Sequence, residues 1–159
     1  MIHFANATEV ANFLTRVRLH VGQYSDVVLC SPFIDDCLLC TIRELAQCAP
    51  ENGCGLKIIT SPCAADRVFA GVSLTARRRT RVIACPHLHA KFYVAIGRKR
   101  TKTEAIVTSA NLTSAGLTSN IELGVRITPT TPQGRTLFEE LDRFARQPTF
   151  NRSIQWKRQ

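Results

Sequence analysis

The fold is decided by two apolar stretches, Ala90-Lys91-Phe92-Tyr93-Val94-Ala95-Ile96 and Ala105-Ile106-Val107-Thr108-Ser109. Each is a short apolar run of the kind that forms a buried strand. The turn that joins them, from Gly97 to Glu104, is short and basic. We therefore predict that the two strands pair as a hairpin.

Outward from this hairpin, strands alternate with helices along the chain. Short apolar runs predict further strands, and apolar residues at helical spacing predict helices. The predicted strands are 26–31, 56–60, 81–85 and 121–127, and the predicted helices are 8–21, 38–48 and 134–146. Residues 64–80 are expected to form a short helix and then an arginine-rich loop, and residues 114–117 a turn or short helix. This alternation indicates the α/β class, with helices on both faces of a mixed sheet.

The chain has 159 residues, of which 45% are hydrophobic, and this suits one globular domain. We expect that domain over residues 1–147, followed by a polar, basic tail over 148–159. No apolar run is long enough to cross a bilayer, and the first residues lack the pattern of a secretory signal. We therefore expect a cytoplasmic protein with no membrane partner.

Cysteine is frequent, with seven residues, and an odd number cannot all pair within one chain. Without a secretory signal, the simplest interpretation is reduced thiols in the cytosol. The spacing Cys37-x-x-Cys40 suits two ligands of a zinc ion. A structural zinc site needs a second close pair, however, and Cys48, Cys54 and Cys63 do not form one. The sequence therefore predicts no bound metal.

Positive charge is concentrated in one segment. From Arg67 to Thr103 there are ten Lys and Arg residues and no acidic residue, whereas the rest of the chain has eleven basic and twelve acidic residues. A local excess of this kind suits a polyanion such as nucleic acid. The alternative is a solvated basic face that only aids solubility. The predicted nucleic-acid-binding residues are Arg77, Arg78, Arg79, Arg81, Arg98, Lys99, Arg100 and Lys102.

The residues that can carry chemistry lie at the ends of the predicted strands. His89 and Lys91 stand where one strand begins, and Ser109 and Asn111 stand at the end of the next. If these strands are neighbours, an imidazole, an ammonium, a hydroxyl and a carboxamide share one surface. An imidazole can attack phosphorus while the other three groups neutralise or hydrogen-bond the phosphate oxygens. Glu122, on the following strand, is expected to orient the imidazole through a hydrogen bond.

These elements together resemble the H-x-K…(G/T)-S-x-N…E-x-G signature of the phospholipase D superfamily, especially its small bacterial nuclease-type members with one motif per chain. The resemblance rests on His89-Ala90-Lys91, Thr108-Ser109-Ala110-Asn111-Leu112-Thr113, Gly116-Leu117 and Asn120-Ile121-Glu122-Leu123-Gly124. Ser31-Pro32-Phe33-Ile34 also resembles the usual start of that domain. The similarity extends from about residue 10 to residue 145. It implies a phospholipase D-like mixed sheet in a single domain.

The resemblance also implies a two-step phosphodiesterase that needs neither a metal nor a cofactor. His89 would attack phosphorus to form a phosphohistidine, and a second histidine would protonate the leaving oxygen and then activate water. Family active sites contain two H-x-K motifs, whereas this chain has one. The economical solution is a homodimer with one shared site, to which each chain supplies its own set of site residues. The leading hypothesis is therefore a homodimeric nuclease that acts on DNA or RNA.

Two alternatives remain open at this point. One is a phospholipase D-type lipid hydrolase, which the absent signal peptide and absent interfacial helix disfavour. The other is a catalytically silent nucleic-acid-binding module, for which there is one argument. The family motif has an aspartate five residues after the lysine, and this chain has Ile96 there. A second departure is Thr108, where the family usually has glycine.

Overall fold

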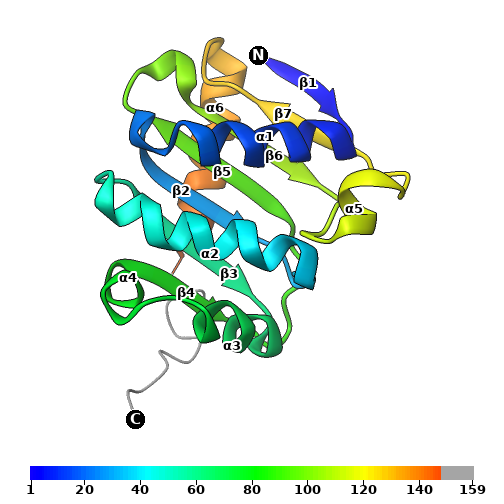
Figure 1. Ribbon diagram of the computed structural model, residues 1–159. Helices are drawn as coiled ribbons and strands as arrows, with labels where there is room; N and C mark the ends of the chain where they lie inside the picture. Colours follow the sequence, from blue (N-terminus) through cyan, green and yellow to red (C-terminus); the bar gives the residue numbers. More distant parts are fainter. Residues whose placement is uncertain (148–159) are drawn as a thin grey trace.

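The computed structural model describes residues 1–147, except for the side chains of Arg78 and Arg79, and it consists of one sheet with helices against both faces (Figure 1). The predicted basic tail, 148–159, lies outside the described residues. The strands are β1 (Ile2–Ala5), β2 (Tyr24–Cys30), β3 (Gly55–Thr60), β4 (Thr80–Ala84), β5 (Phe92–Gly97), β6 (Glu104–Thr108) and β7 (Gly124–Ile127). The helices are α1 (Ala7–Leu19), α2 (Asp36–Glu51), α3 (Pro62–Ala70), α4 (Leu74–Arg79), α5 (Ser114–Thr118) and α6 (Pro132–Ala145), with 3₁₀ turns η1 (Val21–Gln23) and η2 (Arg100–Lys102).

The sheet is mixed, as predicted, and its strand order is β1-β7-β6-β5-β2-β3-β4. Strands β2, β3 and β4 are parallel, and every other neighbouring pair is antiparallel. The predicted hairpin of β5 and β6 is confirmed, with Phe92 opposite Val107. One end of the sheet therefore collects the last residues of β2, β3, β4 and β6 and the first residues of β5 and β7. We name this the carboxyl end, and the opposite end the amino end.

Helices cover both faces of the sheet, also as predicted, but unequally (Figure 1). On one face, Phe13 of α1 and Ile42 of α2 are fully buried against Leu29 and Tyr93 of the sheet. On the other face, α6 is the covering helix among the described residues, and Phe138 and Ala145 pack over Val94 of β5 and its neighbours. Phe144 near the end of α6 reaches the carboxyl end, where its ring packs edge-on against that of Phe92, the first residue of β5.

Helix α2 continues past its predicted end at residue 48, because the structure accommodates Pro50 in the last turn. Proline has no N–H, so the carbonyl four residues earlier loses its helical partner. That carbonyl, of Ala46, accepts a hydrogen bond from the Thr80 hydroxyl at 3.1 Å instead. The Thr80 side chain of β4 therefore replaces the helical hydrogen bond that Pro50 removes. This partner cannot be predicted from the sequence of the helix alone.

Three further predictions about elements are corrected. Residues 77–79 are helical rather than a loop, because the Ser73 hydroxyl caps α4 by accepting from the Ala76 N–H. The strand expected from residue 121 begins only at Gly124. Strand β1 was not expected at all. It pairs with β7 across more than a hundred residues of sequence, a partner that no local pattern reveals.

A buried carboxylate joins α1 to the sheet. Glu104 is 5% exposed and accepts hydrogen bonds from Arg16 of α1 and Arg126 of β7. Pairing on both sides offsets the cost of burying this charge. This network connects β6, the strand that leads to the carboxyl end, to α1 and β7.

None of the helices in residues 1–147 is long and apolar enough to cross a membrane.

Candidate active site

All five predicted site residues lie at the carboxyl end of the sheet, in loops next to strand ends. His89 and Lys91 precede β5, Ser109 and Asn111 follow β6, and Glu122 precedes β7. His89 and Ser109 are exposed, and the other three are half-buried. The strand predicted from residue 90 begins only at residue 92, so the H-x-K segment is irregular backbone rather than strand.

Ser109 and Glu122 form the best-defined part of the site. The Ser109 hydroxyl donates a short hydrogen bond to Glu122 Oε2, and Asn120 Nδ2 donates to Glu122 Oε1 at 3.1 Å. The Leu123 N–H donates to Ser109 Oγ at 3.1 Å, and the Ser109 N–H donates to the Leu123 carbonyl at 3.0 Å. The three bonds that involve Ser109 hold the segment before β7 against the end of β6, and the Asn120 bond fixes the Glu122 carboxylate within that segment. They also explain why residues 121–123 are not strand.

The predicted hydrogen bond between Glu122 and His89 is not among those formed within residues 1–147. The carboxylate takes the Ser109 hydroxyl and the Asn120 amide as its partners instead. In this chain, therefore, Glu122 orients the hydroxyl of the site. The His89 imidazole stays exposed at the surface.

Lys91 is fixed by two hydrogen bonds, one to the segment before β5 and one to the end of β6. Its ammonium donates to the His89 carbonyl at 3.1 Å, and its own carbonyl accepts from the Thr108 N–H at 3.1 Å. The ammonium therefore lies over the backbone of the histidine and beside the strand end that carries Ser109. An ammonium has three N–H donors, so two remain for an anion after the bond to His89.

Asn111 is positioned by the buried Ser31, which the sequence analysis noted only within the segment 31–34 and to which it gave no role in the site. Ser31 Oγ lies 3.5 Å from Asn111 Oδ1, donates to the Phe33 carbonyl at 2.8 Å and accepts from the Leu112 N–H at 3.0 Å. One hydroxyl thus joins the end of β2 to the loop after β6. The sequence feature that could have indicated this role is the position of Ser31, a polar residue at the end of a predicted apolar strand.

A buried tyrosine supports the same loop. Burial raises the pKa of Tyr93 far above its ordinary value, so its hydroxyl stays protonated and donates to the Ala110 carbonyl at 2.8 Å. Asp35 adds a second support, because one carboxylate oxygen caps α2 at the Leu38 N–H and the other accepts from the Ser114 N–H. The loop that carries Ser109 and Asn111 is therefore fixed by groups from β2, β5 and α2.

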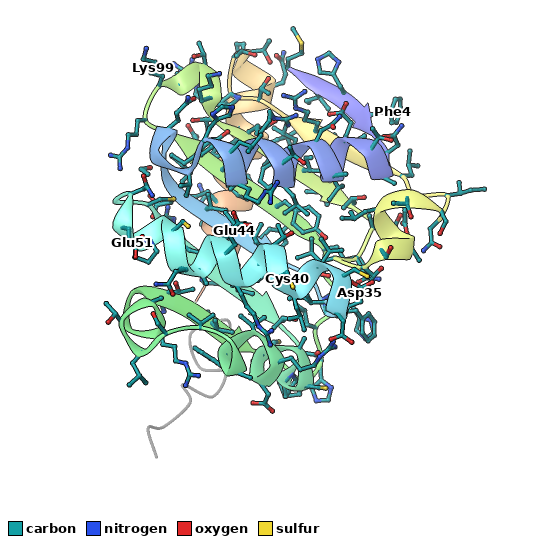
Figure 2. The ribbon with its side chains drawn as sticks, viewed as in Figure 1. Phe4, Asp35, Cys40, Glu44, Glu51 and Lys99 are labelled. Atoms are coloured by element: carbon teal, nitrogen blue, oxygen red, sulfur yellow. The ribbon has the colours of Figure 1, made fainter. Side chains whose placement is uncertain are left out.

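Large apolar side chains are exposed around the same end of the sheet. Leu123 is 66% exposed and Phe33 61%, and Ile121 is fully exposed. Figure 2 shows Phe4 at the end of β1, on the same side of the molecule as Asp35. We name as the apolar rim the five exposed residues Phe4, Phe33, Val107, Ile121 and Leu123.

The basic clusters that the sequence analysis predicted to bind nucleic acid are close to the site residues in sequence but do not flank them in space. The turn 98–102 follows β5 and lies at the amino end, with Lys99 and Asp35 on opposite sides of Figure 2. Strand β5 has six residues, which separates its two ends by roughly 20 Å at about 3.3 Å per residue. Helix α4 also lies at the amino end, because it leads directly into β4.

Several predicted nucleic-acid-binding arginines bind backbone carbonyls. Arg98 donates to the carbonyls of Gly22 and Gly53, and Arg100 donates to that of Pro129. Arg77 donates to two carbonyls that precede its own helix, Phe69 and Val72. These arginine side chains therefore connect neighbouring segments of the chain through hydrogen bonds.

Within residues 1–147, no three His, Cys, Asp or Glu side chains are grouped so as to hold a metal ion.

The sequence matches no protein-family profile and no curated protein. Solved structures with a similar fold are known, however. Nuc from Salmonella typhimurium, a phospholipase D family member, is 15% identical, with a TM-score of 0.52 over 91% of this chain and 93% of Nuc. The polyphosphate kinase of Porphyromonas gingivalis is 12% identical, with a TM-score of 0.59 over 99% of this chain and 27% of the kinase.

TrmBL2, an archaeal chromatin protein whose structure shows a novel mode of DNA binding, is 13% identical, with a TM-score of 0.53 over 91% of this chain and 52% of TrmBL2. This chain therefore spans nearly all of Nuc, half of TrmBL2 and about a quarter of the kinase. Likeness at such low identity concerns the fold alone. The fold is a single-domain, phospholipase D-like α/β fold, as the sequence resemblance implied.

Proposed function

We propose that this protein is a metal-independent phosphodiesterase, a nuclease that cleaves DNA or RNA at a site shared by two copies of the chain. The observation that carries the proposal is the meeting of His89, Lys91, Ser109, Asn111 and Glu122 at one end of the sheet. The fold around them is similar to that of Nuc, a phospholipase D family member of nearly the same length.

The chemistry follows from the groups present. The His89 imidazole attacks phosphorus, so that a P–N bond forms and the P–O bond to the leaving oxygen breaks. The corresponding imidazole of the second copy protonates that oxygen. The same imidazole of the second copy then removes a proton from water. The water oxygen attacks phosphorus, the P–N bond breaks, and His89 of the first copy is released. Lys91 neutralises the phosphate oxygens, and Ser109 and Asn111 hydrogen-bond to them. Glu122 acts as a positioning residue that orients Ser109.

The apolar rim supports the homodimer. Soluble monomers rarely expose several large apolar side chains in one region, and such a region is typical of a protein interface. Ile121 and Leu123 stand on either side of Glu122, so a partner that covered them would approach the site itself. A second copy that docks there through the same surface would bring its own His89 to the shared phosphate.

The second candidate function is a catalytically silent DNA-binding module. The fold similarity to TrmBL2, whose structure shows DNA binding, favours it. The other argument for the binding module is that Ile96 replaces the motif aspartate. The position of Ile96 in the sheet weakens this argument. Ile96 pairs with Asp26 near the amino end of the sheet, far from the His89 loop. An isoleucine at that position removes no group from the proposed site.

The first test is cleavage with excess EDTA, in which single- and double-stranded DNA and RNA are each offered to wild type, His89→Asn and His87→Asn. We expect wild type and His87→Asn to cleave, and His89→Asn to lose roughly a thousandfold or more in rate, because it lacks the nucleophile. His87 is the matched control, since it is an exposed histidine in the same loop.

Two results would contradict the proposal. Equal cleavage by wild type and His89→Asn would remove the histidine from the chemistry. If wild type cleaves none of the four substrates but retards their migration in a native gel, the binding module becomes the better assignment. Binding by His89→Asn should resemble that of wild type in either case, because phosphate contacts rather than the nucleophile supply most affinity.

A further inference from the structure

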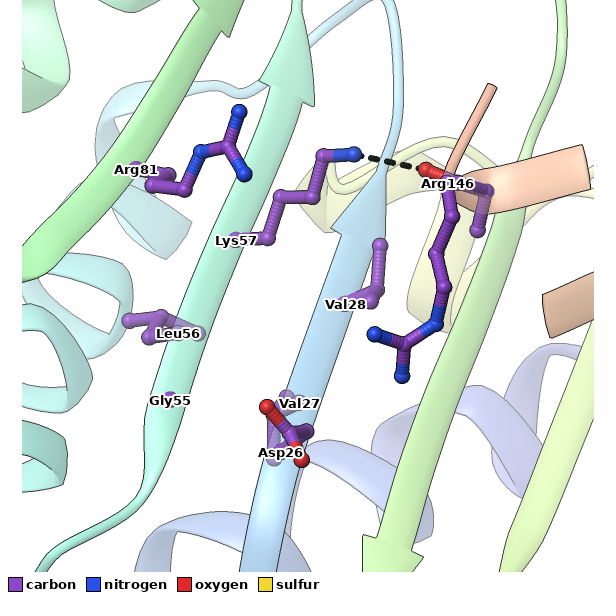
Figure 3. A pocket seen from close by; sticks show the side chains of 9 residues that line it. Asp26, Val27, Val28, Gly55, Leu56, Lys57, Arg81 and Arg146 are labelled. Carbon is purple, nitrogen blue, oxygen red and sulfur yellow. Dashed lines mark hydrogen bonds between the residues drawn. The ribbon is translucent and has the colours of Figure 1, made fainter. Parts of the chain in front are cut away.

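A cavity of about 300 Å³ lies away from the candidate active site, in the amino half of the sheet on the face that α6 covers (Figure 3). Its walls come from β2, β3, β4 and the end of α6. Three cationic side chains line it, Lys57 of β3, Arg81 of β4 and Arg146 just after α6. Figure 3 shows Lys57 and Arg81 side by side on neighbouring strands, with Arg146 extending over the sheet beside β2.

The pairing of the strands places like charges together. Lys57 and Arg81 are direct partners across the parallel strands β3 and β4. Like charges directly opposite one another destabilise a sheet. Burial, and then the charges of Arg81 and Arg146, lower the pKa of Lys57 below its ordinary value. The fold therefore holds three cations around one hollow at an electrostatic cost.

Contacts within the described residues use only part of the hydrogen-bonding capacity of Lys57 and Arg146. Lys57 Nζ donates to the Ala145 carbonyl at 2.6 Å, and Arg146 Nε donates to Asp142 Oδ2 at 2.8 Å. An ammonium has three N–H donors and a guanidinium five. Two carboxylates are near, Asp142 on Arg146 and Asp26 in the wall of the cavity. Of the described residues that line the cavity, three are cationic and one, Asp26, is acidic.

We propose that this cavity is a phosphate-binding exosite. A phosphate accepts several hydrogen bonds at once, and arginine together with lysine is the usual combination that recognises it. The phosphate comes either from a nucleic-acid backbone or from a free phosphorylated molecule, which present the same group to the cavity. Binding relieves the repulsion among Lys57, Arg81 and Arg146.

The surroundings of the exosite favour the backbone of a nucleic acid. The turn 98–102 and helix α4 add basic residues at the same end of the sheet. The cavity lies nearer the candidate active site than this end does, because Asp26 and Lys57 stand four and three residues before the last residues of their strands. At about 3.3 Å per residue this is roughly 10–13 Å along the sheet, or about three to four base pairs at 3.4 Å each. A long substrate can therefore reach both places, and a very short one cannot. This part of the inference rests on the proposed nuclease function.

The first arm of the test measures binding of inorganic phosphate by titration calorimetry, which does not depend on any activity. Wild type should bind phosphate at the exosite, and Arg146→Gln and Arg81→Gln should each weaken that binding about tenfold or more. Arg143→Gln is the matched control, because Arg143 lies three residues earlier, pairs with Glu140 and is outside the cavity. Phosphate binding that is identical in wild type and both cavity variants would overturn the exosite.

The second arm compares cleavage of a dinucleotide with cleavage of an oligonucleotide of about twenty nucleotides. With Arg146→Gln we expect a KM about tenfold higher on the long substrate, an unchanged kcat and unchanged kinetics on the dinucleotide. A variant that loses phosphate binding but keeps its long-substrate KM would assign the exosite to a free phosphorylated molecule. If no form of the protein cleaves, the nuclease proposal fails, and the calorimetric arm still decides the exosite.

Discussion

Ser31 shows how much of the candidate site depends on one buried hydroxyl. It bonds the Phe33 carbonyl and the Leu112 N–H and lies beside the Asn111 amide, so it holds together segments about eighty residues apart. Removing it would leave buried backbone groups without partners, which costs more than the bonds themselves contribute. Its role is to position Asn111 rather than to contact a substrate.

Cysteine reactivity is a prediction at the scale of single residues. Burial raises the pKa of Cys30 from 9.0 to about 12 and that of Cys54 to about 11. Both thiols therefore stay protonated near pH 8, and a thiol is a poor nucleophile. We expect iodoacetamide at pH 8 to alkylate the exposed Cys37, Cys40 and Cys63 in the native protein. Cys30 and Cys54 should react only after unfolding.

Peptide mass spectrometry before and after denaturation measures this pattern. Alkylation of Cys30 in the native protein at the same rate as Cys63 would contradict the burial of the Cys30 thiol.

The raised pKa of Cys30 also affects stability, because the thiol ionises at a lower pH in the unfolded chain than in the folded protein. The contribution of Cys30 to the free energy of unfolding should be complete below about pH 9 and decline between pH 9 and 12.

At the scale of elements, the pairing of β6 with β7 depends on Gly124. A Cβ atom there would lie 2.6 Å from the Val107 carbonyl oxygen and 2.8 Å from Thr108 Cβ. Both are atoms of the neighbouring strand, so a side chain at this position would push β7 away from β6. That movement would separate Glu122 from Ser109, whose hydrogen bond crosses between the same two segments.

We therefore expect Gly124→Ala to lower the free energy of unfolding by about 1–3 kcal/mol, the usual cost of overpacking. It should also reduce cleavage, because Ser109 loses its orientation. Gly22→Ala is the control, since a Cβ at Gly22 meets only the Asn52 side chain, at 3.4 Å. Urea unfolding and the cleavage rate measure the two effects. Equal stability of the two variants would show that β6 and β7 tolerate a side chain there.

At the scale of the whole molecule, the two ends of the sheet differ in character. The carboxyl end holds the candidate active site and the apolar rim, whereas the amino end holds the basic turn, α4 and the phosphate cavity (Figures 1 and 2). This separation suits a protein that meets a second copy at the end where the proposed cleavage takes place and binds a more distant part of the same polyanion at the other end.

The homodimer is the prediction that belongs to this scale. Light scattering of wild type should give twice the monomer mass of 17.7 kDa. Leu123→Asp should give the monomer and lose cleavage, because a charge at the interface is costly to bury. Leu74→Asp is the matched control, since Leu74 is a similarly exposed leucine, 73% against 66%, at the start of α4. A wild-type monomer that cleaves would contradict the shared site.

The sequence by itself determined the α/β class and the central hairpin, and it supplied the candidate residues for the proposed chemistry. Strand and helix periods are local properties, so the strands predicted over 90–96 and 105–109 were recognisable without their partners. The candidate site residues were predicted for a related reason, together with the resemblance to a family signature. His89, Ser109 and Glu122 stand next to apolar runs, and polar groups that follow buried strands collect at the ends of a sheet.

The tertiary structure alone decided which distant groups meet. It turned Glu122 toward Ser109 rather than His89, gave Pro50 a partner in Thr80, and placed the basic turn at the far end of the sheet from the histidine loop. It also brought Lys57, Arg81 and Arg146 around one cavity. The physical reason is that strand order, direction and register come from long-range pairing, whereas a local pattern reports only the period of its own segment.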